Sequence, residues 1–240
     1  MRYLDLILNQ LKAILKTTST TGIKKIYSDF FKLHEENKVL MLHRQDLYKP
    51  GPPHKHFSQK MLDLVEKHAG SQILDIGCGH GVNCKELNSR GFRCVGIEAN
   101  EEYAREAQKY VEAYHMNAEK LDFPNKSFDT VIMLEVLEHL EHPYKALEEI
   151  VRVTRRNLIL SVPNLEPLET CVKYNVIMHH FFDVTHVNFF TKPMLERFLK
   201  TYFPYVEVGE FGKFFSISGR KLYYHLSGIA SFEPFRQASR

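Results

Sequence analysis

The sequence lacks several features that indicate particular classes of protein. No stretch approaches 18 consecutive apolar residues, so we expect no membrane-spanning helix. The four cysteines form no Cys-x-x-Cys pair, and so few in 240 residues do not make a disulfide framework. The net charge of +3 is too small by itself to indicate nucleic-acid binding. Because the N-terminus also lacks a signal-peptide pattern, we expect a cytoplasmic protein with reduced thiols.

Apolar residues make up 44% and charged residues 25%, as in ordinary globular proteins. From residue 58 onward, short apolar segments that read as strands alternate with helical segments. The predicted strands are 72–76, 93–97, 113–116, 130–134, 157–162, 205–208 and 214–218. The predicted helices are 58–69, 81–90, 101–111, 143–153 and 192–201. This alternation predicts an α/β fold, with a Rossmann-like, seven-stranded, mostly parallel sheet and helices on both faces.

The chain is expected to have three parts. Residues 1–57 form an N-terminal helical extension, 58–222 form the α/β domain with a long insert at 163–190 that reads as a substrate lid, and 223–240 form a C-terminal tail. Residues 1–60 carry 11 Lys and Arg against 5 Asp and Glu. The favoured interpretation is a cap over the active-site mouth or an oligomer contact. Peripheral membrane contact by residues 1–16, or nucleic-acid binding, is the alternative.

A glycine-rich segment, Asp75-Ile76-Gly77-Cys78-Gly79-His80-Gly81, lies where the first strand turns into a helix. Glycines there let the backbone approach a ligand closely. A dinucleotide fingerprint would need a third small residue at position 82, which is Val82. A Walker A loop would need Gly-Lys-Ser/Thr, which is absent. A turn with no ligand is the remaining structural alternative.

The glycine segment, followed by an acid, Glu98, at the end of the next strand, resembles class I S-adenosylmethionine (SAM)-dependent methyltransferases. The resemblance covers residues 72–162. It implies that Asp75 helps to hold the methionine ammonium and that Glu98 hydrogen-bonds the ribose hydroxyls. It also implies that the adenine lies against Asn117 and Ala118. The remaining cofactor-binding residues expected on this basis are Gly77, Cys78, Gly79, Gly81, Ala99 and Leu134.

A polar cluster follows the fourth strand, in Leu134-Glu135-Val136-Leu137-Glu138-His139. Residues at i, i+3 and i+4 can share one face of a helical turn. Together with a later histidine, His186, two carboxylates and two imidazoles suit a divalent cation such as Mg or Mn.

This cluster resembles those of the ubiquinone-pathway O-methyltransferases and the small-RNA 2′-O-methyltransferases. The resemblance implies that Glu135, Glu138, His139 and His186 are metal ligands. The alternative is a metal-free site in which Glu135 shapes the pocket and His139 is a general base. We expect Glu135, His139 and His186 to serve catalysis.

One departure bears on the substrate. The small-RNA enzymes carry Phe-Glu-Trp after the final histidine, where this chain has Asn188-Phe189-Phe190 and no Trp anywhere. Residues 182–191 instead resemble bacterial methyltransferases that accompany polysaccharide or secondary-metabolite pathways. The resemblance therefore favours O-methylation of a hydroxyl on a small molecule or glycan. RNA ribose 2′-O-methylation, C- or N-methylation of a metabolite, and a non-catalytic SAM-binding protein stay as alternatives.

Overall fold

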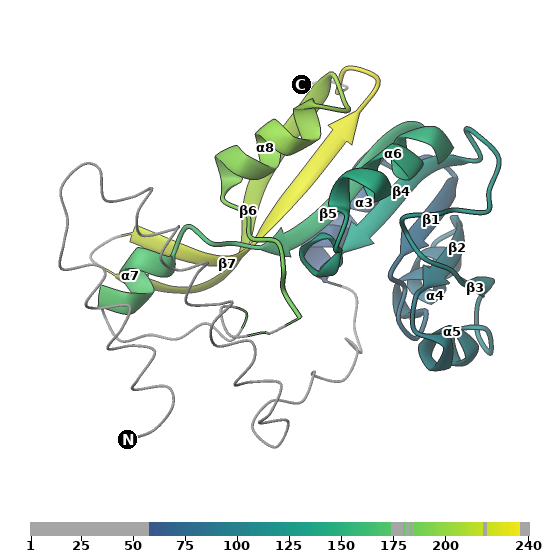
Figure 1. The fold of residues 1–240 in the computed structure, drawn as a ribbon, viewed down its shortest axis with the longest axis horizontal. Coiled ribbons are helices and arrows are strands. Elements are labelled where there is room, and N and C mark those ends of the chain that lie inside the picture. Colours follow the sequence, from purple (N-terminus) through teal and green to yellow (C-terminus); the bar gives the residue numbers. More distant parts are fainter. Residues whose placement is uncertain (1–57, 174–179, 181–182, 184, 218–219, 236–240) are drawn as a thin grey trace. The chain divides into compact units, whose positions relative to one another are not determined.

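The computed structural model describes residues 58–173, 180, 183, 185–217 and 220–235 (Figure 1). The chain divides into two compact units, one of residues 1–51 with 165–186 and the other of 52–164 with 187–240. The predicted extension 1–57 lies outside the described residues, so its helices and its contacts stay predictions. None of the described helices is long and apolar enough to cross a membrane.

The larger unit is built on one seven-stranded sheet in the order β3-β2-β1-β4-β5-β7-β6. The strands are β1 Gln72–Ile76, β2 Arg93–Glu98, β3 Ala113–His115, β4 Phe128–Leu134, β5 Thr154–Pro163, β6 Tyr205–Ile217 and β7 Arg220–Ser231. The first five run parallel to one another, and β7 lies antiparallel between β5 and β6. The predicted seven-stranded, mostly parallel sheet is therefore confirmed.

The five predicted helices are also present in the larger unit, with ends that shift by a few residues. They are α3 Gln59–His68, α4 Val82–Ser89, α5 Glu101–Ala107, α6 Pro143–Val153 and α8 Lys192–Lys200. A short 3-10 helix, η1, covers Leu137–His139 after β4. In the smaller unit, α7 spans Leu168–Lys173, inside the predicted insert.

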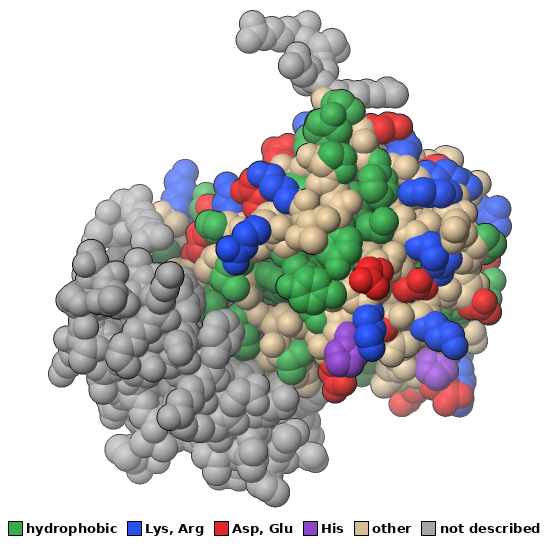
Figure 2. All heavy atoms as spheres, turned by 45° about the horizontal axis from the view of Figure 1, so that its top comes forward, with side chains coloured by type: hydrophobic (Ala, Val, Ile, Leu, Met, Phe, Trp, Pro, Cys, Tyr) green, Lys and Arg blue, Asp and Glu red, His purple; other side chains and the backbone are tan. Residues whose placement is uncertain are grey.

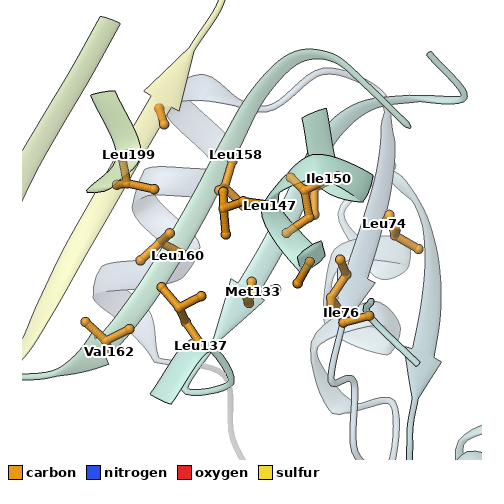
Figure 3. Packing of buried hydrophobic residues seen from close by; sticks show 14 of the residues in the cluster. Leu74, Ile76, Met133, Leu137, Leu147, Ile150, Leu158, Leu160, Val162 and Leu199 are labelled. Carbon is orange, nitrogen blue, oxygen red and sulfur yellow. The ribbon is translucent and has the colours of Figure 1, made fainter. Parts of the chain in front are cut away.

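The central strands are buried on both faces, because successive side chains point to opposite sides of the sheet. Leu74 faces a core shared with Leu147 of α6 and Leu199 of α8, part of which Figure 3 shows. Ile73, one residue earlier, faces a second core shared with Val65 of α3 and with α4. Burial of the strands on both sides explains why they read as continuous apolar runs rather than as alternating ones.

The predicted end of the domain is wrong in its last two strands. The segments 205–208 and 214–218 are parts of one strand, β6, and the seventh strand is β7, which begins at Arg220. The expected boundary at residue 222 therefore falls inside β7, and most of that strand lies in the expected tail 223–240. Gly212 adopts φ +68°, and the ladder continues past it with a register shift between Lys213 and Phe215.

Candidate functional site

The glycine segment turns sharply between β1 and α4. Gly77, Gly79 and Gly81 all have positive φ values, which side chains other than glycine rarely allow. A Cβ added to Gly77 would lie 2.3 Å from Val136 Cγ2. The absence of a side chain at Gly77 therefore lets the loop pack directly against the segment that follows β4.

Glu98 is fixed by the same loop. Its Oε2 accepts a hydrogen bond from the Gly79 N–H at 2.9 Å, and its Oε1 accepts one from the Asn100 N–H at 2.9 Å. The side chain is half-buried at the end of β2. Each carboxylate oxygen can accept more than one hydrogen bond, so both keep capacity for a ligand. The contacts hold an acceptor-only group in one orientation, as recognition of two neighbouring hydroxyls requires.

The segment expected to touch adenine begins next to Glu98. The Met116 N–H donates to the Glu98 carbonyl at 3.0 Å, and the Asn117 Oδ1 accepts from the Glu119 N–H at 2.8 Å. Asn117 is exposed and Ala118 is buried. The exposed Ala99 contributes its carbonyl, which accepts from His115 Nε2 at 3.0 Å.

Asp75 lies fully buried one residue before the end of β1. Its Oδ2 is 3.9 Å from the Cys84 thiol, and its Oδ1 has no hydrogen-bond partner in the described part of the chain. Burial raises the pKa of the Asp75 carboxyl from 3.8 to about 7, against a smaller lowering by the Asn83 side chain. A buried, incompletely satisfied carboxyl is stabilised in its charged form by a nearby cation, and the SAM ammonium is such a cation.

Cys78 packs inside the loop. Its side chain is buried, and a Cβ added to Gly96 of β2 would lie 2.6 Å from Cys78 Sγ. Burial raises the pKa of the Cys78 thiol far above its usual range, so the group stays protonated. The structure thus supports a packing role for the Cys78 side chain.

Glu135 follows β4 directly, with Leu134 as the last, half-buried residue of the strand. Glu135 has φ +56°, an uncommon backbone conformation for a residue with a side chain. Its N–H donates to the Ser161 carbonyl of β5 at 3.0 Å. Its Oε2 lies 3.1 Å from Nδ1 of His225 on β7. The backbone therefore aims this carboxylate across the end of β5.

The expected sharing of one face by Glu135, Glu138 and His139 is not seen. In the described part of the chain, Glu135 belongs to no group of three ligand atoms close enough to share an ion. The Glu138 side chain is buried and the His139 side chain is exposed, with 3.9 Å between His139 Nε2 and Glu138 Oε1. The turn is a 3-10 helix, in which the α-helical spacing does not apply.

His186 lies at the end of the smaller unit. It is buried, its Nδ1 is 3.0 Å from the His180 carbonyl, and its Nε2 is 3.5 Å from Asp183 Oδ2. The Val187 and Asn188 N–H groups, which follow it in the chain, donate to the Glu138 carbonyl. The metal role expected of His186 stays a prediction.

Sequence reasoning missed His225. The residue falls in the expected tail, 90 positions after Glu135, and only the pairing of β7 with β5 brings the two together. Its ring stacks on Phe211 of β6, with 5.0 Å between ring centroids and 27° between planes. His225 could have been placed near Glu135 only if residues 220–231 had been recognised as a strand that pairs with β5.

Comparison with known proteins supports the assignment of the fold. Residues 74–162 match the family model described as a methyltransferase domain. The chain is 33% identical over 111 residues to the O-methyltransferase resE of Aspergillus sclerotiorum, over 42% of each protein. It is 29% identical over 119 residues to a ubiquinone biosynthesis O-methyltransferase of Hahella chejuensis, over 44% of this chain and 50% of that protein. The chain thus spans half or less of the length of these relatives.

The fold resembles that of a SAM-dependent methyltransferase from Archaeoglobus fulgidus, with a TM-score of 0.60 and 18% identity over 72% of this chain and 91% of that one. The strand order is the one typical of class I methyltransferases. The matched region begins in β1 and ends in β5, and it contains the glycine loop, Glu98 and Glu135. Residues 74–162 therefore form a class I SAM-dependent methyltransferase domain.

Proposed function

We propose that the chain is an enzyme that transfers the methyl group of SAM to a hydroxyl on a small molecule or glycan. The observation that carries the proposal is the Glu98 carboxylate, held between the Gly79 and Asn100 N–H groups beside a loop of three left-handed glycines. When bound, SAM supplies a methyl group that its sulfonium already activates.

The residues present fit this cofactor. Glu98 would accept hydrogen bonds from the ribose hydroxyls, and Asp75 would hold the methionine ammonium, directly or through water. Asn117 and Ala118 would border the adenine. The buried Asp75 Oδ1, which has no hydrogen-bond partner in the described part of the chain, is accounted for by a cationic ligand nearby.

Transfer to oxygen is favoured by the polar groups that follow β4 and by the relatives, two of which are named as O-methyltransferases. An RNA substrate is less favoured. On the face drawn in Figure 2, basic and acidic side chains of the described residues are interspersed, whereas RNA binding favours a continuous basic area.

The test is transfer of labelled methyl from SAM into a fractionated extract of the source cells. We expect label in a small-molecule or glycan fraction, attached through oxygen. Label in RNA, or attached through nitrogen or carbon, would replace the proposed acceptor by one of the alternatives. Absence of label in every fraction, with SAM bound, would contradict the proposed enzyme.

The same reaction run with EDTA tests the predicted cation. Loss of transfer with EDTA, restored by Mg or Mn, would support the predicted metal site. Full transfer after exhaustive dialysis against chelator would leave the metal-free interpretation.

A further inference from the structure

Glu135 and His225 form a carboxylate–imidazole pair whose geometry fixes the proton on the ring. The 3.1 Å contact joins Glu135 Oε2 to His225 Nδ1. Because an ionised carboxylate only accepts hydrogen bonds, Nδ1 carries the hydrogen. A neutral His225 therefore presents an unprotonated Nε2, which is the atom that a general base uses.

The second ring nitrogen of His225 belongs to a partly exposed side chain. Nε2 has no hydrogen-bond partner among the described residues, and the side chain is 30% exposed. The ring is nevertheless held in place, since it stacks on Phe211. Gly212 leaves room for it, because a Cβ there would lie 3.0 Å from His225 Cδ2. The imidazole is thus fixed in orientation, and its side chain is partly exposed.

The pair lies at the same edge of the sheet as the glycine loop. His225 pairs with Pro163, the last residue of β5, and Glu135 follows the last residue of β4. The neighbouring Val136 packs against Gly77 of the loop. Ligands of parallel α/β sheets bind at this carboxyl edge. The positive φ of Glu135 is a local strain of the kind that collects at functional sites.

We propose that His225 Nε2 accepts the proton of the acceptor hydroxyl during methyl transfer, and that Glu135 is the positioning residue that holds the ring. This inference rests on the proposed O-methylation. The acceptor O–H bond breaks and its proton passes to Nε2. The oxygen electron pair forms the new C–O bond as the C–S bond of the donor breaks, and that pair of electrons stays on sulfur. The products are the methyl ether, S-adenosylhomocysteine and an imidazolium paired with Glu135.

His139, the base expected from the sequence, has a different setting. Its side chain is exposed, and its Nε2 lies 3.9 Å from Glu138 Oε1, beyond hydrogen-bonding distance. His225 is proposed for the proton because Glu135 orients its ring through Nδ1.

The test compares His225→Gln and Glu135→Gln with a control, His68→Gln, at the end of α3 near the opposite edge of the sheet. SAM binding is measured by calorimetry, and turnover is measured on the extract fraction that takes up label from SAM. We expect SAM affinity within about twofold of wild type in all three. Turnover should fall by about 10²- to 10⁴-fold in His225→Gln, the usual contribution of a general base, and stay unchanged in His68→Gln.

Nitrogen-15 NMR of the histidine rings gives a readout that does not need turnover. With the wild-type resonance assigned by its loss in His225→Gln, we expect the Nδ1–H tautomer of neutral His225, and a mixture of tautomers in Glu135→Gln. A purely structural contact would leave turnover near wild type in both variants, which would overturn the inference. So would an Nε2–H tautomer in the wild-type protein, or loss of SAM binding by folded His225→Gln.

Failure of the proposed function looks different. A wild-type protein that binds SAM but labels no fraction contradicts the proposed methyl transfer and, with it, the role of the pair in that reaction. A wild-type protein that transfers methyl while His225→Gln keeps full turnover contradicts only the assignment of His225. If His225→Gln does not fold, the turnover of Glu135→Gln decides in the same way.

Discussion

The buried Asp75 carboxyl should make the free protein less stable as the pH rises. Its pKa is raised to about 7 in the fold, against 3.8 when it is exposed. Between these values the folded state binds more protons than the unfolded state, so the free energy of unfolding falls with increasing pH. At about 1.4 kcal/mol per pKa unit, a difference of about 3 units costs the folded state about 4 kcal/mol by pH 8.

The substitution that isolates this effect is Asp75→Asn, which has similar size and no charge. We expect the wild-type protein to lose about 1.4 kcal/mol per pH unit relative to Asp75→Asn between about pH 4 and pH 7, and little more above that. The variant should therefore be the more stable protein at pH 8 in the absence of SAM. It should also bind SAM more weakly, because the ammonium loses its carboxylate partner.

The assay is urea unfolding at pH 5, 6, 7 and 8, followed by far-ultraviolet circular dichroism, since the chain has no Trp for fluorescence. The comparison of slopes between the two proteins removes the titration of all other groups. Parallel pH dependence in wild type and Asp75→Asn would refute the argument that burial holds this carboxyl in its neutral form. Unchanged SAM affinity in the variant would remove Asp75 from the binding site.

Three further outcomes are expected. Gly77→Ala should abolish SAM binding, because its Cβ would meet Val136 at 2.3 Å, whereas Gly91→Ala, also at positive φ but with nothing within 4 Å, should bind SAM normally in calorimetry. Gly96→Ala should lower stability by about 1–3 kcal/mol in urea unfolding through overpacking against Cys78, and Cys78→Ala should recover part of the loss; no recovery would refute the contact. The four cysteines are buried. Burial is the largest cause of the raised thiol pKa values of Cys78, Cys94 and Cys171, and hydrogen bonding with Cys94 is the largest cause for Cys84. All four should react slowly with a thiol reagent in the native protein and quickly after unfolding; rapid native reaction would contradict their burial.

Strands β1, β2, β4 and β5 were predictable because they are largely buried on both faces and are separated by helices with clear periodicity. The segment Gln72–Ile76, for example, reads as a short apolar run before a glycine turn, and the structure has the strand at those residues. The last two strands were not predictable in the same way. β6 is longer than the two segments predicted for it, and β7 carries buried polar residues such as Ser227. Tertiary pairing decided these strands against local preference.

The site divides along the same line. Glu98 and the glycines could be identified from the sequence because local backbone geometry demands them at fixed spacing. The Glu135–His225 contact could not be identified from the sequence. It joins residues 90 positions apart, and it depends on a strand order that local sequence patterns do not determine. The metal cluster expected from i, i+3 and i+4 spacing assumed an α-helical turn, but the chain forms a 3-10 turn at Leu137–His139.

Binding of SAM at Glu98 tests the central claim most directly. Calorimetry should show one SAM bound per chain. In Glu98→Gln one acceptor oxygen becomes an NH₂ group, so we expect at least a tenfold loss of affinity, about 1.4 kcal/mol. Glu112 is exposed and directly precedes β3, and Glu112→Gln should bind SAM like the wild-type protein. Equal affinity in wild type and Glu98→Gln, or no binding by the wild-type protein, would contradict the account.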